Sequence, residues 1–263
     1  MRTLILAPLM LLAACDTHAT APQAKDATPT GQVLKPGETV TAPIVLTAPD
    51  GAKVYGRYTR VGNAKALILL FHQAGASKDE YAAIQPRLAK MGFSSLAIDA
   101  RAGGDLFGPN ETITHLGHTG SYGDAKQDLD TAVKFGLNEG PPVILWGSSY
   151  SSAWVFPIAA EHRGQIAAVM AFSPGEYLSE NKVGQAAALV DAPVFVTSAK
   201  DPDEIAAARA IVAAVPRDAT QFIPTKGGVH GSSTLLATRD PEGAEENWAA
   251  VAAFLKRFTG PGK

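Results

Sequence analysis

The sequence has a single cysteine, Cys15, among its 263 residues, so an internal disulfide is impossible. It also lacks an excess of charge of one sign: 23 Lys and Arg against 25 Asp and Glu give a net charge of -2, which favours neither a nucleic-acid partner nor an acidic substrate. The apolar run Leu4–Leu12 is too short to span a bilayer. The remaining composition, 46% hydrophobic and 18% charged, is typical of one soluble α/β domain with an additional segment at the start.

That first segment has the features of an export signal. A short positive region, Met1–Thr3, precedes the apolar run, and Leu12-Ala13-Ala14-Cys15 follows it. These four residues resemble the lipobox of bacterial lipoprotein signal peptides. The resemblance implies cleavage before Cys15, lipidation of its thiol and new amino group, and a location on the periplasmic side of a membrane. Asp16 resembles the inner-membrane retention signal of enteric lipoproteins. An ordinary secretory signal with a chance cysteine is the alternative.

The chain is expected to divide into three parts. Residues 1–14 are predicted to be the signal peptide, and residues 15–43 the lipidated cysteine with a flexible tether. This tether is rich in Ala, Thr, Pro, Lys and Gln without apolar periodicity, and it cannot bury enough surface to fold. Residues 44–260 are predicted to form the folded domain.

Strands and helices alternate through most of that domain. Asp50-Gly51 is a strong hairpin signal, and Ser77 with Glu80 is predicted to form a capping box. The predicted strands are Ile44–Thr47, Lys53–Tyr58, Ala66–Phe71, Ser94–Asp99, Val143–Trp146, Ala167–Phe172, Val194–Ser198 and Gln221–Ile223. The predicted helices are Lys78–Met91, Asp124–Leu137, Ala153–Glu161, Glu204–Val215 and Glu242–Phe258. This order predicts a mostly parallel sheet with helices on both faces and a ligand site beyond the carboxyl ends of the strands.

One stretch, Pro142–Ser152, starts as an apolar strand and ends in a cluster of small residues. Within it, Gly147-Ser148-Ser149-Tyr150-Ser151 fits the pattern G-x-S-x-G of a nucleophile elbow, with Ser151 in place of the last glycine. The sharp turn of such an elbow lifts the central side chain clear of the sheet. The spacing therefore predicts Ser149 as the nucleophile.

Centring the motif on Ser148 would place Trp146 and Tyr150 at the flanking positions, and both are too bulky for strand and helix to cross. The backbone N–H of Tyr150 follows the nucleophile at a predicted helix N-terminus, where developing negative charge is favoured. Tyr150 is thus predicted to supply half of an oxyanion hole. A Ser-rich turn without chemistry is the alternative that the motif alone leaves open.

A serine hydroxyl is a poor nucleophile unless a base takes its proton and a carboxylate orients that base. His230 is the candidate base, because it follows the last predicted strand and lies between glycines in Gly227–Gly231. The carboxylate should lie between serine and histidine in the chain, at the end of a strand. Asp201 does so and is the predicted acid, with Asp203 and Glu204 as close substitutes. A core or surface role for His230 is the alternative.

The second donor of the oxyanion hole should follow the third predicted strand, where Phe71-His72-Gln73-Ala74-Gly75 lies. The donor is the N–H of Gln73 or Ala74, with Ala74 slightly favoured. His72 precedes the serine in the chain and is predicted to brace this loop.

Residues 44–258 resemble an α/β-hydrolase of the dienelactone-hydrolase-like group. The matching pieces are the 72–75 loop, Asp99–Gly104, the elbow, the Asp201 turn, His230-Gly231 and the order Ser149, Asp201, His230. Dienelactone hydrolases proper carry a cysteine nucleophile, whereas this chain has serine. The resemblance implies an α/β-hydrolase fold and hydrolysis of esters, lactones or thioesters, and peptidases are among the relatives.

The leading interpretation is a lipid-anchored serine hydrolase of carboxylic esters. A serine peptidase of the same fold and a non-catalytic binding protein of the envelope are the alternatives. The expected partners are a small-molecule ester and, through Cys15, the membrane, with no nucleic acid. A haloalkane dehalogenase or epoxide hydrolase of this fold would carry Asp at the elbow position that Ser149 occupies, so the serine argues against that chemistry.

Other polar residues are predicted to serve the structure. No cofactor or metal is expected, and His115 and His118 are read as loop histidines because the sequence places no third ligand beside them. Asp99 and Arg101 are expected to pair or to anchor a loop. The long segments 102–122 and 174–190 should border an open cleft.

Overall fold

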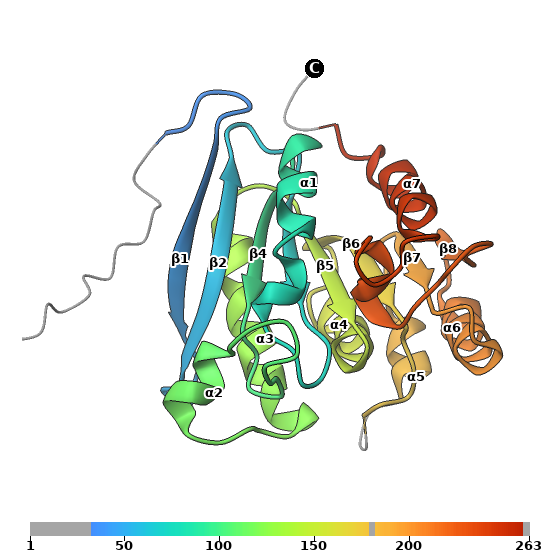
Figure 1. Cartoon of the computed structure of the whole chain (residues 1–263), viewed down its shortest axis with the longest axis horizontal. Helices are drawn as coiled ribbons and strands as arrows, with labels where there is room; N and C mark the ends of the chain where they lie inside the picture. The colour runs from blue at the N-terminus through green and yellow to red at the C-terminus, as the bar shows by residue number, and fades with distance from the viewer. Residues whose placement is uncertain (1–32, 179–181, 260–263) are drawn as a thin grey trace, which may run out of the picture.

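The computed structural model describes residues 33–178 and 182–259, which build one eight-stranded sheet with helices on both faces (Figure 1). The predicted signal peptide and Cys15 lie outside the described residues. The strands are β1 (Thr39–Thr47), β2 (Lys53–Val61), β3 (Leu67–Phe71), β4 (Ser94–Ile98), β5 (Val143–Ser148), β6 (Ile166–Phe172), β7 (Val194–Thr197) and β8 (Ala219–Phe222). Their spatial order is β1-β2-β4-β3-β5-β6-β7-β8. From β4 to β8 all neighbours are parallel, and β1 and β2 form the predicted antiparallel hairpin.

The predicted boundary between tether and domain, at residues 43 and 44, is wrong. The first strand begins at Thr39, so Thr39–Pro43 belong to the sheet and pair with β2. Pro43, opposite Arg57, has no backbone N–H, whereas a central strand must hydrogen-bond to a neighbouring strand on each of its two edges. It is tolerated because β1 has a neighbour on one side only.

Helices cover both faces of the sheet. They are η2 (Lys78–Tyr81), α1 (Ile84–Lys90), α2 (Glu111–Leu116), α3 (Tyr122–Asn138), α4 (Tyr150–Glu161), α5 (Val183–Ala187), α6 (Pro202–Ala214), η3 (Gly231–Leu235) and α7 (Ala244–Leu255), where η marks a 3-10 helix. No helix within residues 33–178 and 182–259 combines the length and the apolar character needed to cross a membrane.

Two hydrophobic cores lie on opposite sides of the sheet, as the side-chain alternation of β3 illustrates. Leu69 belongs to the core that includes side chains of α3, α4, α5 and α6, whereas Leu70 belongs to the core that includes side chains of η2, α1, η3 and α7. Every residue of β3 is fully buried, as expected for a central strand covered on both faces. The rigid sheet thus fixes the positions of the loops at its carboxyl end.

The predicted helix Lys78–Met91 is interrupted. A single 3-10 turn, η2, precedes α1, in which Pro86 is the third residue. Proline lacks an N–H and is accommodated in the first turn of a helix, where that donor has no intrahelical partner. The predicted capping box is also wrong: the Ser77 hydroxyl accepts from the N–H of Asp79, and the Glu80 side chain turns into the protein interior. The segments 102–122 and 174–190 contain the short helices α2 and α5.

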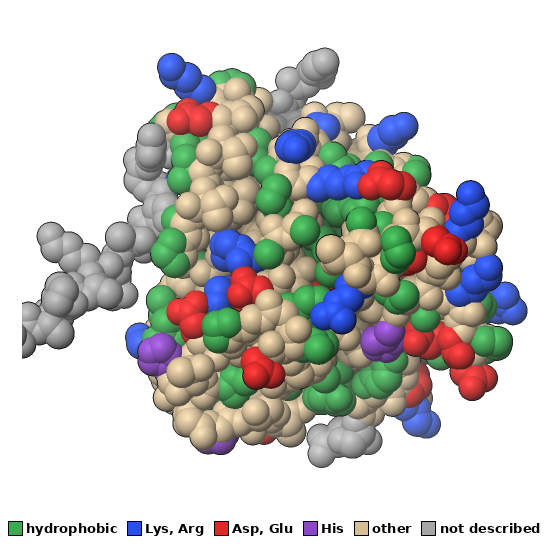
Figure 2. Space-filling model, viewed as in Figure 1, with side chains coloured by type: hydrophobic (Ala, Val, Ile, Leu, Met, Phe, Trp, Pro, Cys, Tyr) green, Lys and Arg blue, Asp and Glu red, His purple; other side chains and the backbone are tan. Residues whose placement is uncertain are grey.

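Charged side chains of both signs are interspersed on the face of the molecule that Figure 2 shows. Several form ion pairs that tie elements together, such as Arg87 of α1 with Glu245 of α7. Such exposed pairs contribute little to stability, about 0–1 kcal/mol each. Their mixing avoids an extended surface of one sign on this face.

Candidate active site

The turn from β5 into α4 holds Ser149 in an unusual backbone conformation, with φ 59° and ψ -123°. A positive φ strains a residue that has a side chain, by about 1–3 kcal/mol, and such strain concentrates at functional sites. The N–H of Ser149 is fixed by the carbonyl of Phe172 on β6, at 2.8 Å. Ser149 is 9% exposed whereas Ser148 is completely buried, so it is Ser149 that reaches the carboxyl end of the sheet.

Small residues permit this turn. A Cβ at Gly147 would lie 2.5 Å from the Cα of Ser152, so the crossing of strand and helix requires glycine there. Ser151, which replaces the last glycine of the motif, is buried, and its hydroxyl is hydrogen-bonded to both the elbow and β3. It accepts from the N–H of Ser148 at 2.9 Å and donates to the carbonyl of Phe71 at 2.7 Å. The substituted serine therefore ties the elbow to β3.

His230 lies in the loop between β8 and η3 and reaches Ser149. Its Nε2 lies 2.7 Å from Ser149 Oγ, across 81 residues of sequence. Glycine at 231 is required, because a Cβ there would lie 2.5 Å from Ser148 Oγ and its φ is +66°. The structure thus brings together the predicted nucleophile and the predicted base.

The predicted acid is wrong. Glu204 Oε1 lies 2.8 Å from His230 Nδ1, whereas the Asp201 carboxylate accepts from the N–H groups of Asp203 and Glu204. Asp201 is the N-cap of α6, and Pro202 follows as its first residue. This cap places Glu204 in the first turn, facing back toward β7, where its Oε2 also accepts from the N–H of Ala199.

The protonation states follow from these contacts. Burial alone would raise the pKa of Glu204, but hydrogen bonds from His230, Ser173 and the N–H of Ala199 hold that pKa below its ordinary value. The ionised carboxylate can only accept, so His230 Nδ1 carries a proton and Nε2 is free to accept from Ser149. The same hydrogen bond, which His230 donates to Glu204, raises the pKa of His230 and outweighs the opposing effect of burial.

Ser173, directly after β6, braces this arrangement. Its hydroxyl accepts from the N–H of Gly231 at 2.9 Å and also hydrogen-bonds Glu204. Its φ is +54°, a second strained residue beside the site. The signal for Ser173 in the sequence is weak, since a serine after a strand is common in loops.

Only one of the two predicted donors in the 72–75 loop is available. The N–H of Gln73 donates to Glu80 Oε2 at 2.8 Å, so the assignment of Gln73 to an oxyanion hole is wrong. Ala74 remains the candidate from this loop, and the other candidate donor, the N–H of Tyr150, lies at the start of α4. His72 braces the loop as expected: Nδ1–H donates to the Gln73 carbonyl, and Nε2 accepts from the N–H of Ala100.

The polar residues that follow β4 anchor the surrounding loops. Asp99 is buried, pairs with Lys78 at 2.8 Å and accepts from the N–H of Glu111. Arg101 pairs with the buried carboxylate of Asp128 at 2.7 Å. These contacts confirm the expectation that Asp99 and Arg101 serve ion pairing.

The prediction that His115 is a loop histidine is wrong, because His115 lies in α2, where its ring stacks on Tyr55 with centroids 4.4 Å apart. No cluster of three or more His, Cys, Asp or Glu side chains suited to a metal occurs in the described part of the chain. Tyr150 is buried beneath Tyr122, with ring centroids 4.6 Å apart. The half-exposed Tyr122 therefore covers the ring of Tyr150, and only the backbone N–H of Tyr150 remains a candidate for the site.

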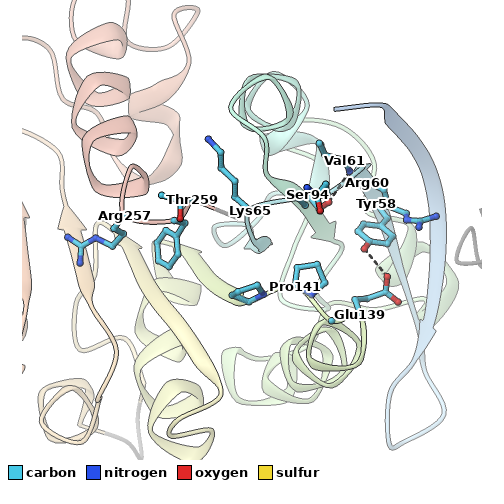
Figure 3. A pocket seen from close by; sticks show the side chains of 14 residues that line it. Tyr58, Arg60, Val61, Lys65, Ser94, Glu139, Pro141, Arg257 and Thr259 are labelled. Atoms are coloured by element: carbon cyan, nitrogen blue, oxygen red, sulfur yellow. Dashed lines mark hydrogen bonds between the residues drawn. The ribbon is translucent and has the colours of Figure 1, made fainter. Parts of the chain in front are cut away.

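A cavity of about 530 Å³ lies elsewhere, at the opposite end of the sheet (Figure 3). Ser94 and Pro142, which line it, lie where β4 and β5 begin, and Tyr58 donates a hydrogen bond to Glu139 in its wall. Ser149 lies where β5 ends. Since ligands of parallel sheets bind beyond the carboxyl ends of the strands, this cavity is not the candidate active site.

Comparison with solved structures shows the α/β-hydrolase fold. An esterase from Pyrococcus furiosus is 18% identical, with a TM-score of 0.63, covering 85% of this chain and 92% of its own. A dienelactone hydrolase from Anabaena variabilis is 16% identical, with a TM-score of 0.66 and coverages of 84% and 98%. A thermostable carboxyl esterase from Bacillus coagulans is 12% identical, with a TM-score of 0.67 and coverages of 83% and 99%.

Comparison with curated proteins finds no match. A protein-family model described as serine aminopeptidase, S33, matches residues 62–221, which include β3, the elbow and Glu204 and end before His230. This match spans more than half of the chain. The chain therefore belongs to this hydrolase family, serine aminopeptidase S33, and has the α/β-hydrolase fold.

Proposed function

We propose that this protein is a serine hydrolase that cleaves carboxylic ester bonds, lactones and thioesters included, through an acyl-serine intermediate. The observation that carries the proposal is the hydrogen-bonded chain from Ser149 Oγ through His230 to Glu204, with distances of 2.7 and 2.8 Å. A serine with that partner loses its proton as it attacks, because the imidazole accepts it and the carboxylate stabilises the resulting imidazolium.

In the acylation step Ser149 Oγ attacks the carbonyl carbon of the ester while its proton moves to His230 Nε2. The carbonyl oxygen becomes an oxyanion, for which the N–H groups of Tyr150 and Ala74 are the proposed donors. The intermediate collapses when the bond to the leaving alcohol breaks and His230 returns the proton to that oxygen. A water, deprotonated by His230 in the same way, then attacks the acyl-serine and releases the acid.

An ester preference is supported by the similar structures, which are those of esterases and of a dienelactone hydrolase. The family description supports an aminopeptidase as the second candidate. An aminopeptidase needs a carboxylate for the free amino group of its substrate. Glu204 and Glu80, the two carboxylates that contact the triad histidine and the elbow, are committed to His230 and to Ser148.

The proposal includes attachment to a membrane of the bacterial envelope through lipidated Cys15. The lipobox resemblance of Leu12–Cys15 supports it. Because β1 begins at Thr39, about two dozen residues separate the anchor from the sheet. At about 3.3 Å per extended residue, they are long enough to hold the active site clear of the headgroups.

Labelling with a fluorophosphonate and peptide mapping test the nucleophile. We expect a covalent adduct on Ser149 and none in a Ser149→Ala variant, and an adduct on Ser148 or Ser151 would contradict the assignment. Short acyl p-nitrophenyl esters and aminoacyl p-nitroanilides then separate the two candidates. Turnover of the anilides in preference to the esters would favour the aminopeptidase.

A further inference from the structure

Glu80 is a completely buried carboxylate beside the elbow, and the mechanism above does not use it. It lies in η2, and its side chain points away from the helix end that the sequence pattern assigned to it. Burying an ionisable group is costly unless its hydrogen bonds are satisfied. The contacts of Glu80 therefore require an explanation.

Three donors meet this carboxylate. Oε1 accepts from the Ser148 hydroxyl at 2.7 Å and from Gln73 Nε2 at 3.4 Å. Oε2 accepts from the N–H of Gln73 at 2.8 Å. The Ser148 hydroxyl in turn accepts from the N–H of Ser232, at 2.8 Å. Every one of these groups donates, which is the arrangement that suits an ionised carboxylate.

These contacts join three separate parts of the candidate site. Gln73 precedes Ala74, the proposed donor of the oxyanion hole, and Ser148 precedes the nucleophile. Ser232 lies two residues after the base, His230. The Glu80 side chain thus fixes the spacing between the oxyanion loop (residues 72–75), the elbow and, through Ser148, the loop that holds His230.

The charge of Glu80 also acts on the base. Two carboxylates raise the pKa of the His230 imidazole: Glu204 from α6, more strongly and through its hydrogen bond, and Glu80 from η2 through its charge. Burial raises the pKa of Glu80 to about 7, and the donors and His230 oppose that rise. The phenols of Tyr81 and Tyr150 also face Glu80 and are neutral, since burial raises their pKa values.

We infer that Glu80 is a positioning residue of the active site, which clamps the oxyanion loop to the elbow and supplies a second negative charge to the imidazolium formed at His230. The inference rests on the proposed function for its effect on turnover. Its effect on the histidine is independent of any substrate. Glu80 is not a catalytic residue, because it contacts neither Ser149 Oγ nor the position of the substrate carbonyl.

A Glu80→Gln variant tests both parts. The amide keeps the size of the side chain, removes the charge and presents a donor where Gln73 or Ser148 also donates. We expect kcat on a p-nitrophenyl ester to fall about tenfold to a hundredfold, less than the 10²–10³ for a deleted oxyanion donor, because the donor is displaced rather than removed. KM should change by less than about threefold, because the substrate does not contact Glu80, and the acid limb of kcat/KM should move to lower pH.

The matched control is Asp128→Asn, which also removes a buried carboxylate charge. Asp128 pairs with Arg101 and is not among the groups that shift the pKa of His230. We expect its acid limb to match that of the wild-type protein. Titration of His230 by NMR, assigned by comparison with a His230→Gln variant, should show a lower pKa in Glu80→Gln and no change in Asp128→Asn. This readout needs no turnover, so it separates failure of the inference from failure of the proposed function.

An unchanged His230 titration together with unchanged kcat in Glu80→Gln would overturn the inference. A loss of kcat with the same histidine titration and acid limb would reduce Glu80 to a purely structural role and equally overturn it. Should Glu80→Gln fail to fold, Ser148→Ala removes the elbow contact and leaves the carboxylate in place. That variant should lower the fluorophosphonate labelling rate of Ser149 about tenfold, and an unchanged rate would contradict the clamp.

Discussion

Replacing Glu204 by Gln is the most direct test of the site, because it separates the acid found in the structure from the one that the sequence favours. The amide retains the shape of the side chain but loses the charge that its contacts with His230 Nδ1 and with the N–H of Ala199 stabilise. If the amide group faces Nδ1, the imidazole must carry its proton on Nε2, toward Ser149, and it then cannot accept the proton of the serine. The equivalent change in a serine protease costs about 10⁴ in kcat.

Glu204 is partly exposed, and solvent screens part of its interaction with the imidazolium. We therefore expect a loss of about 10³ to 10⁴ in kcat/KM, which corresponds to about 4–5 kcal/mol of transition-state stabilisation. The assay is kcat/KM on one activated ester between pH 5 and 9. Circular dichroism should show the wild-type fold, because Glu204 is partly exposed and lies in the first turn of α6.

The matched controls are Asp201→Asn and Asp203→Asn. Asparagine is as good an N-cap as aspartate, so the first variant should keep α6 and retain activity within about threefold. The second removes a carboxylate in the same helix turn. If Asp201→Asn costs more than Glu204→Gln, the geometry of this turn is wrong and so is our assignment of the acid.

The remaining predictions concern His230, Glu80, Ser173 and Cys15. His230→Ala should abolish nearly all turnover. The kcat/KM of the wild-type protein should fall as pH drops through the pKa of His230, which the hydrogen bond to Glu204 raises above 6.5. An apparent pKa of the acid limb well below 6.5 would contradict this. The stability contributed by Glu80, whose pKa rises from 4.5 to about 7 on folding, is complete below pH 4.5 and is lost as pH rises through 7. In chemical denaturation, the free energy of unfolding of Glu80→Gln relative to that of the wild type should therefore increase by about 3 kcal/mol from pH 4.5 to pH 9. A difference that stays constant over this range would refute the raised pKa of Glu80. Ser173→Ala and Ser173→Gly should each lower activity about tenfold, since both delete the hydroxyl that holds Gly231 and Glu204. The glycine variant should be more stable than the alanine variant by about 1 kcal/mol, because glycine relieves the strained φ. Equal melting temperatures of the two variants would count against strain at this position. Cys15→Ala should leave the protein unlipidated, as mass spectrometry and detergent partitioning would show. A soluble form that begins near residue 33 should keep full esterase activity. Loss of activity in that form would contradict a role of Cys15 confined to anchoring.

Much of the fold could be predicted from local patterns. The apolar run of β3 and the Asp50-Gly51 turn are each sufficient to define an element, because a buried strand needs continuous apolar residues and a tight hairpin needs a residue with positive φ. The failures occur where a side chain has a distant partner. Glu80 fits a capping box by spacing, but its carboxylate is used by Gln73 and Ser148 instead.

By itself the sequence determined the candidate nucleophile, because small residues at fixed spacing around Ser149 are a local requirement of the strand-to-helix turn. It also determined the candidate base, since His230 is the histidine that follows the last strand of the sheet. The candidate acid was decided only by the tertiary structure. Asp201, Asp203 and Glu204 lie within four residues, and each step along a helix rotates a side chain by about 100°, so the start of α6 selects which carboxylate faces the histidine. Asp201 starts the helix by capping it, and that role, fixed by the backbone around it, leaves Glu204 to meet His230.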